Sequence, residues 1–203
     1  MPNIPFRERL AQGVVLLDGA TGTMLHAREN LPIDTCFDLL NLTDPGAVES
    51  VHALYLDAGA EILETNTFSA NVLKLSACDL QDSCADINRA GVDIVRRAIV
   101  ASGRDDVYIA GSVGPLGRRL APFGRLTPEE ARDAFSIQTG ALIEAGADLL
   151  LFETFTDLHE IAWAIQAARA IRQNIPIVAQ MTFNRDNRTA LGDIGRGWGG
   201  FIN

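Results

Sequence analysis

The sequence is poor in cysteine, and its three cysteines are scattered over the chain: Cys36, Cys78 and Cys84. So few cysteines cannot form a disulfide framework, which favours a reducing compartment such as the cytoplasm. Their spacing also differs from that of zinc-binding cysteine pairs. We therefore expect no metal site built from the cysteines that are present.

Basic residues are scarce as well. Lysine and arginine total 17 against 26 acidic residues, which gives a formal net charge of −9 at pH 7. This charge repels phosphate backbones, so we expect no nucleic-acid partner. No apolar run approaches the roughly 18 residues that span a bilayer, and residues 1–12 contain no secretory signal region. We expect a cytoplasmic protein with no membrane partner.

Hydrophobic residues make up 47% of the 203 residues, enough for a substantial core. Short apolar runs rich in valine, isoleucine and leucine predict buried strands of a parallel sheet at 14–17, 62–63, 107–110, 149–152 and 175–179. Between them, helical periodicity predicts helices over 45–58, 88–101, 128–145 and 158–172. The fold class is therefore α/β, either a doubly wound sheet or part of a (β/α)₈ barrel.

Start and stop signals support these helices. Thr127, Pro128 and Glu130 form the pattern of a capping box at the start of the third one. Gly59 and Gly146 follow two of the predicted helices, where a helix commonly ends.

The length of the chain bears on the choice between these folds. A complete barrel needs roughly 250 residues, and the sequence contains about five β/α units. Residues 1–192 are expected to form the N-terminal part of a barrel, and residues 193–203 a glycine-rich tail that cannot be the next helix. We interpret the chain as an incomplete barrel.

Ligand-binding residues of such folds follow the strands, at their carboxyl ends. Asp18, Glu64 and Glu153 stand at these positions, and a buried carboxylate needs a cationic or hydrogen-bonding partner. An ammonium group would supply it, which indicates an amino acid ligand, although Glu64 suits a structural role equally well. The glycines of the 18–23 loop let backbone N–H groups approach a ligand, but no nucleotide fingerprint is present.

Other enzyme classes fit less well. A lyase or aldolase could use Glu153 as a base, but Schiff-base chemistry needs a lysine at a strand end, and Lys74, the only lysine, is elsewhere. His26, His52 and His159 fall on or beside predicted helices, where packing or solvent exposure is expected rather than catalysis.

Five ordered motifs together resemble the homocysteine S-methyltransferase family, above all the homocysteine-binding module of its cobalamin-dependent methionine synthases. The resemblance covers residues 14–192. The motifs are Asp-Gly-Ala-Thr-Gly-Thr at 18–23, Glu-Thr-Asn-Thr-Phe at 64–68, Gly-Ser-Val-Gly-Pro at 111–115, Phe-Glu-Thr-Phe at 152–155 and Met-Thr-Phe at 181–183.

The resemblance implies a (β/α)₈ TIM barrel that binds homocysteine at its strand ends and activates the thiol with zinc. Carried over to this sequence, Asp18 and Glu153 would bind the ammonium group. The backbone at Gly19 and Ala20, in the loop that reaches Thr23, would meet the carboxylate. Asn66, with Thr67 beside it, would form the pocket floor.

The family's zinc-binding cysteines, one in a Gly-x-Asn-Cys segment and two in a Cys-Cys pair, do not occur in this sequence. The family activity is zinc-dependent methyl transfer to homocysteine, and we expect this chain alone to be inactive. The alternative is a non-catalytic amino-acid-binding remnant or regulatory fragment. The motifs favour a cobalamin- or folate-linked methyl donor, and the open barrel edges predict self-association.

Overall fold

The computed structural model describes residues 2–32, 34–189 and 192, so the predicted tail over 193–203 lies outside the described residues. Within them, four parallel strands form one sheet: β1 (Ile62–Glu64), β2 (Tyr108–Val113), β3 (Leu149–Phe155) and β4 (Ile177–Met181). The strands lie side by side in the order of the sequence, β1-β2-β3-β4. A doubly wound sheet reverses its order at a switch point, whereas a barrel does not. The order is that of a (β/α) barrel.

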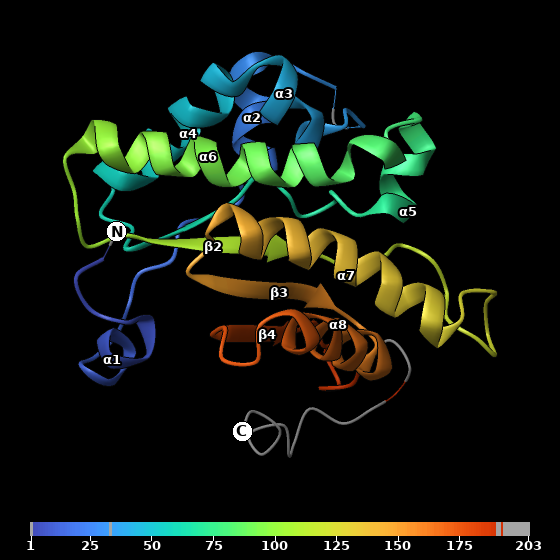
Figure 1. Ribbon diagram of the computed structural model, residues 1–203. Coiled ribbons are helices and arrows are strands. Elements are labelled where there is room, and N and C mark those ends of the chain that lie inside the picture. Colours follow the sequence, from blue (N-terminus) through green and yellow to red (C-terminus); the bar gives the residue numbers. More distant parts are fainter. Residues whose placement is uncertain (1, 33, 190–191, 193–203) are drawn as a thin grey trace.

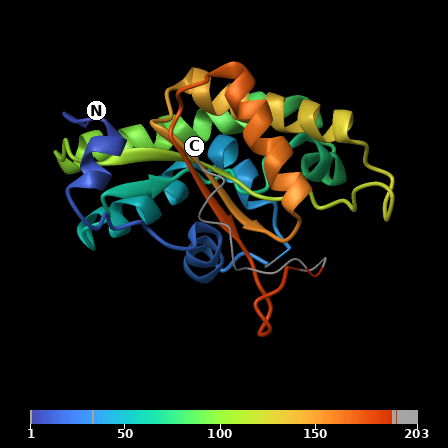
Figure 2. The ribbon, with the colours of Figure 1, turned by 90° about the horizontal axis from the view of Figure 1, so that it is seen from below.

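Helices occupy most of the remaining chain. They are α1 (Phe6–Ala11), α2 (Thr21–Glu29), α3 (Leu40–Thr43), α4 (Pro45–Asp57), α5 (Val72–Leu75), α6 (Cys84–Ser102), α7 (Pro128–Ala145) and α8 (Leu158–Ile171), with 3-10 turns η1 (Phe37–Leu39), η2 (Ser76–Cys78) and η3 (Gln81–Ser83). Helices α6, α7 and α8 run along one face of the sheet (Figures 1 and 2). None of the helices in the described residues is long and apolar enough to cross a bilayer.

The main hydrophobic core lies between the sheet and these helices. Strand residues such as Leu63, Ile109 and Leu150 point into it and meet helix residues such as Val95 and Leu142. Leu63 and Leu150 have no exposed surface. The apolar strands therefore bury one face against the helices, as their continuous hydrophobic runs predict.

The opposite face of the sheet points toward the interior of the barrel. Its apolar residues form a smaller cluster: Ile62, Tyr108, Ala110, Leu149 and Leu151, covered by Phe6 of α1. The Phe6 and Tyr108 rings meet edge to face, with centroids 5.3 Å apart. Successive residues of a strand alternate between faces. Two residues beyond this cluster, the same face presents Glu64, Ser112 and Glu153 at the carboxyl ends of the strands.

The predicted boundaries of α4, α7 and α8 agree with the structure to within one residue, whereas α6 begins four residues before its predicted start. Helix α7 begins with the predicted capping box: the Thr127 hydroxyl accepts from the Glu130 N–H, and the Glu130 carboxylate accepts from the Thr127 N–H. It ends at Gly146, whose φ of 94° is in the left-handed region.

The strand predicted at 14–17 is wrong in extent. Only Leu17 bridges to Ile62, in parallel, and the Leu16 carbonyl accepts from the Glu61 and Ile62 N–H groups. Val14, with 83% of its surface exposed, lies outside the core. With a single bridge to β1, the segment pairs too few residues to form a strand, although its residues are apolar.

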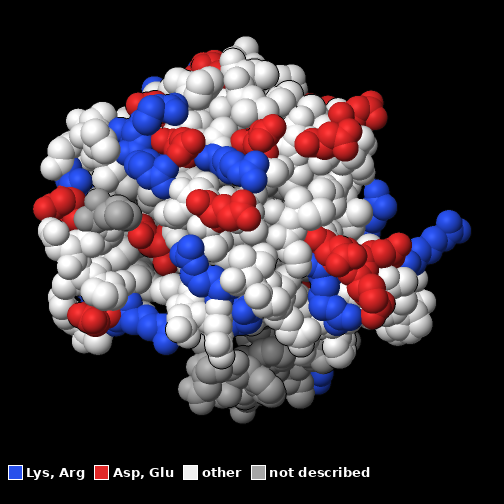
Figure 3. All heavy atoms as spheres, viewed as in Figure 1, with Lys and Arg blue, Asp and Glu red and all other residues white. Residues whose placement is uncertain are grey.

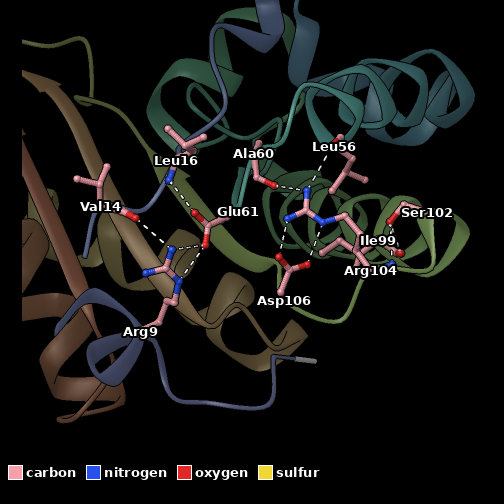
Figure 4. A network of polar contacts seen from close by, with 10 residues as sticks. All are labelled: Arg9, Val14, Leu16, Leu56, Ala60, Glu61, Ile99, Ser102, Arg104 and Asp106. Carbon is pink, nitrogen blue, oxygen red and sulfur yellow. Dashed lines mark hydrogen bonds and ion pairs between the residues drawn. The ribbon is translucent and has the colours of Figure 1, made fainter. Parts of the chain in front are cut away.

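At the amino ends of the strands, two arginines form hydrogen bonds that connect segments distant in sequence (Figure 4). Arg9 of α1 donates twice to one Glu61 oxygen, at 2.9 and 2.6 Å, and once to the Val14 carbonyl. Arg104 donates to both Asp106 oxygens and to the Ala60 carbonyl. Both networks lie at the end of the sheet opposite the polar residues that follow the strands.

Charged side chains of both signs are interspersed on the face shown in Figure 3. Several form ion pairs on the helices, among them Arg96–Asp93, Arg97–Glu49 and Arg132–Glu129. This mixed surface gives no continuous basic patch on the face shown. The prediction that the chain has no nucleic-acid partner stays a prediction.

Candidate functional site

A pocket of about 470 Å³ opens at the carboxyl ends of the strands, between β1, β2, β3 and the start of α2. Five residues predicted from the sequence line it: Gly19, Ala20, Thr23, Asn66 and Glu153. The remaining lining residues are Thr21, Gly22, Phe37, Asp38, Glu64, Thr65, Thr67, Phe68, Ser69, Ser112 and Thr154. Lysine and arginine are absent from this lining, as the structure describes it.

Asp18, the sixth predicted residue, borders the lining residues. Its Oδ2 accepts from the Glu64 N–H at 3.0 Å. Its Oδ1 is buried and has no hydrogen-bond partner within the described chain. One carboxylate oxygen is therefore fixed by the backbone, and the other is open to a donor that the described residues do not supply.

Two glutamates meet at the pocket wall. The Glu64 and Glu153 side chains hydrogen-bond to each other, and the Ser112 hydroxyl donates to Glu153 Oε1 at 2.6 Å. A hydrogen bond between two carboxyl groups requires a proton on one of them. Burial, followed by the nearby charge of Glu153, raises the pKa of Glu64 well above neutrality, so Glu64 carries that proton.

Asp18 belongs to the same electrostatic group. Burial raises its pKa from 3.8 to about 7, against the lowering effect of the hydrogen bond from the Glu64 N–H. The charge of Glu153 adds a smaller increase. Three carboxyl groups thus converge on a space that no lysine or arginine lines within the described part of the chain, which makes the space attractive to a cation.

The floor of the pocket is a chain of hydroxyl contacts. Thr65 Oγ1 and Thr67 Oγ1 lie 2.6 Å apart, and the Thr67 hydroxyl donates to the Ser112 carbonyl at 2.8 Å. Thr65 Oγ1 in turn accepts from the Ser112 N–H. These buried contacts hold the ends of β1 and β2 in register and fix the hydroxyl that donates to Glu153.

Asn66 anchors the loop opposite the strands. Its amide group donates to the Phe37 carbonyl at 2.8 Å and to Asn41 Oδ1 at 3.0 Å. Asp38, the neighbour of Phe37, accepts from the Ser69 N–H at 3.0 Å. Burial raises the pKa of Asp38 to about 6, while Lys74 lowers it. The pocket wall formed by η1 is therefore fixed by two hydrogen bonds, one from Asn66 and one from the Ser69 N–H.

The first turn of α2 forms the other side of the pocket. Its N-cap residue, Ala20, has no side chain that could accept from the first N–H groups, and no acidic residue lies in the first turn. The Thr21 hydroxyl is buried without a partner in the described chain. Because uncapped N–H groups and the helix dipole attract anions, this side of the pocket suits a carboxylate.

Sequence reasoning missed part of this site. It left the role of Glu64 open and did not select Thr21, Ser112 or Asp38. Glu64 and Ser112 could have been found by alternation, since each stands two residues after an inward-facing apolar residue. No sequence pattern points to Asp38, because it belongs to the 3-10 turn η1, which does not directly follow a strand in the sequence.

The described residues do not fit the zinc site that the sequence resemblance implies. No three histidine, cysteine, aspartate or glutamate side chains among them are grouped to hold a metal. All three cysteines are free and none lines the pocket. Cys84 is buried, and its thiol donates to the Ala70 carbonyl. No chemical step of this site can be derived through a metal.

Solved structures resemble the fold closely. The homocysteine methyltransferase MmuM from Escherichia coli, in its oxidized form, gives a TM-score of 0.81 at 25% identity, over 96% of this chain and 71% of that chain. Its metallated form gives 0.79 at 24% identity, over 95% and 72%. The incomplete (β/α) barrel predicted from the sequence is thereby confirmed.

Sequence comparisons agree. A methionine synthase of Mycobacterium tuberculosis (strain ATCC 25618 / H37Rv) is 34% identical over 195 residues, which cover 90% of this chain but 16% of that protein. The chain therefore spans about a sixth of this relative. The model of the family described as homocysteine S-methyltransferase matches residues 15–195. The chain belongs to the homocysteine S-methyltransferase family.

Proposed function

We propose that the chain binds homocysteine as a zwitterion in the pocket between the strand ends and α2. The observation that carries this proposal is the bipolar character of the pocket. Three acidic side chains gather on one side, and an uncapped helix N-terminus lies on the other. An amino acid has the matching pair of charges on one carbon atom.

The ammonium group is assigned to Asp18 and Glu153. Asp18 Oδ1 is buried without a partner in the described chain and therefore accepts from the ammonium at no loss of an existing bond. Glu153 already accepts from Ser112 and from protonated Glu64, which orient its carboxylate. Two charge-assisted hydrogen bonds in a partly buried site contribute about 1.5–3 kcal/mol each.

The carboxylate is assigned to the start of α2. The backbone of Gly19 and Ala20 leads into the helix, and the N–H groups of the first turn are not capped by a side chain. The Thr21 hydroxyl adds a donor that lacks a partner in the described chain. A carboxylate at a helix N-terminus is favoured by both the free N–H groups and the dipole.

Zinc and the methyl donor are the second part of the proposal. In the family-level activity that we propose, zinc lowers the pKa of the homocysteine thiol and so supplies a thiolate for methyl transfer, with a cobalamin- or folate-linked donor favoured. The absence of a three-ligand metal group among the described residues supports an inactive chain when it stands alone. The alternative role, an amino-acid-binding module without catalysis, rests on the same observation.

A cytoplasmic location belongs to this proposal and is supported by three free cysteines.

Isothermal titration calorimetry with homocysteine and methionine tests the pocket. Asp18→Asn and Glu153→Gln are each expected to weaken binding by about 10- to 100-fold, the loss of one charge-assisted bond. Glu29→Gln, at an exposed position at the far end of α2, is the matched control and should bind like the wild type. Binding by both pocket variants at wild-type affinity would contradict the proposed site.

Two further measurements separate the parts of the proposal. 4-Mercaptobutanoate lacks the ammonium group, so its weak binding should not fall further in Asp18→Asn. Elemental analysis and a methionine-formation assay on the purified chain are expected to show neither stoichiometric zinc nor product. Tightly bound zinc together with methionine formation would overturn the assignment of inactivity while leaving the pocket intact.

A further inference from the structure

The three cysteines lie close to one another beside the pocket, around α5 and η2. Cys84 is buried in a small cluster with Ala70, Leu75 and Ile87. Cys36 is half-buried and packs against this cluster. Cys78, the last residue of η2, is exposed. The chain therefore presents one accessible thiol next to two less accessible ones.

Cys36 and Cys78 are distant in sequence but lie near each other in the fold. Cys36 packs against the cluster that contains Leu75, three residues before Cys78. Cys78 also acts on the Cys36 thiol, through its charge and as a hydrogen-bonding neighbour, so the two thiol groups lie close together. Two neighbouring thiols on adjacent segments can form a disulfide with limited movement of the backbone.

We propose that Cys36 and Cys78 are a redox modification site, which a low-molecular-weight disulfide oxidises to an intramolecular disulfide. The exposed Cys78 thiolate first attacks one sulfur of the small disulfide, which forms a mixed disulfide and releases one small thiolate. The Cys36 thiolate then attacks the Cys78 sulfur, forms the Cys36–Cys78 bond and displaces the second small thiolate. Two electrons pass to the small disulfide, and the two cysteine protons end on its two released thiols.

The surroundings of the thiols set this order. Cys78 is exposed and meets the reagent first. Burial, then the charge of Asp38, raises the pKa of the Cys36 thiol to about 11, while the Leu39 N–H lowers it. Cys36 therefore reacts as the second, resolving thiol. Cys84 is excluded because it is buried and its thiol donates to the Ala70 carbonyl.

The disulfide would act on the pocket wall. Cys36 directly precedes Phe37 and Asp38, which both line the pocket. The Phe37 carbonyl and the Asp38 carboxylate accept the hydrogen bonds that join this wall to Asn66 and Ser69. A covalent link from Cys36 to η2 restricts the opening of this wall. In a reducing compartment such a disulfide is transient, as in redox-sensing proteins.

The test is an oxidation series of the full chain in mixtures of reduced and oxidised glutathione. Free thiols are then alkylated, and disulfide-linked peptides are mapped by mass spectrometry. We expect a Cys36–Cys78 linkage with Cys84 alkylated. Cys36→Ser should accumulate a glutathione mixed disulfide on Cys78, because the resolving thiol is gone. In Cys78→Ser, Cys36 and Cys84 should remain thiols, and circular dichroism establishes that both variants fold.

Amide hydrogen exchange provides the second readout, which needs no ligand. Oxidation of the wild type should slow exchange at least severalfold at Leu39 and Ser69, whose N–H groups hold the wall, and should have no such effect in Cys78→Ser. The site is overturned if both thiols stay alkylatable under conditions that saturate the mixed disulfide in Cys36→Ser, or if Cys84 enters the linkage. Unchanged exchange in the oxidised wild type would overturn the link to the pocket.

Discussion

Glu64 is held as a neutral acid by its position at the end of β1. Its side chain shares a hydrogen bond with Glu153 in a pocket where both are half-buried, and two neighbouring carboxyl groups do not ionise together in such a setting. The proton makes Glu64 a donor, so it supports the charge of Glu153 rather than competing with it. Asp18 and Glu153 are left as the acceptors for a ligand's ammonium group.

Retention of this proton makes the stability of the chain pH-dependent. The pKa of Glu64 is raised above its ordinary value of 4.5, and that of Asp18 rises from 3.8 to about 7. Above the ordinary values the unfolded chain releases protons that the folded chain keeps. The free energy of unfolding should therefore be largest below about pH 4. It should fall as the pH rises through the folded-state pKa values of the two groups.

Glu64→Gln tests this linkage, since glutamine imitates the protonated acid and cannot ionise. The variant should match the wild type near pH 4 and exceed it by about 1–3 kcal/mol near pH 8, because each unit of pKa shift corresponds to about 1.4 kcal/mol. Urea unfolding at a series of pH values measures the difference. Glu29→Gln, an exposed control, should show no trend; a pH-independent offset in Glu64→Gln would contradict the linkage.

The sequence predicts those site residues that have a local signal. Glu153 directly follows an apolar run, and it lines the pocket. The Glu64–Glu153 hydrogen bond could not be read in the same way, because it joins two β/α units. The unpartnered Thr21 hydroxyl is likewise a property of the folded pocket, since its burial depends on what packs around α2.

Helix α1 is attached to the sheet by an ion pair that no sequence pattern predicts. Arg9 donates two hydrogen bonds to Glu61, and about a fifth of each side chain is exposed, at 22% and 18%. The Tyr108 hydroxyl donates to the Ile4 carbonyl just before the helix. Together with the Phe6 ring, these contacts cover the amino end of the barrel interior.

A double-mutant cycle on Arg9→Ala and Glu61→Ala measures this attachment. We expect a coupling energy of about 1–2 kcal/mol, because the pair is largely buried and makes two bonds to one oxygen. The same cycle on the exposed pair Arg132–Glu129 should give less than about 0.5 kcal/mol. Chemical unfolding of the wild type and the six variants provides both values, and equal coupling in the two pairs would contradict the role given to burial.

Elements with their own stop and start signals were predicted best. Helix α7 matches the predicted range of 128–145 because its capping box and Gly146 are encoded locally. Helix α6 begins at Cys84, four residues before the predicted start, since no cap marked that end. The strand expected at 14–17 is absent because only Leu17 of this segment pairs with β1 in the described chain, and such pairing is not encoded in the apolar run itself.

On the scale of the whole molecule, the sheet is a barrel that does not close within the described residues. Strand β4 pairs with β3, and the structure describes no strand on its other side. At the opposite edge, Val14 and Leu16 are 83% and 54% exposed. The MmuM structure that shares this fold is matched over 71% of its length. An open edge with free N–H and C=O groups is a template for pairing with another chain.

We therefore expect the chain to self-associate through β4, which makes its mass by light scattering rise with concentration. Gln180 is exposed on this strand, and a lysine there would bring like charges together across a β4–β4 contact. Gln180→Lys should raise the dissociation constant at least about fivefold, or about 1 kcal/mol, whereas Gln180→Thr, which retains strand propensity, should not. A wild-type monomer at every concentration would show that the edge is protected. An equal response of the two variants would place the contact away from β4.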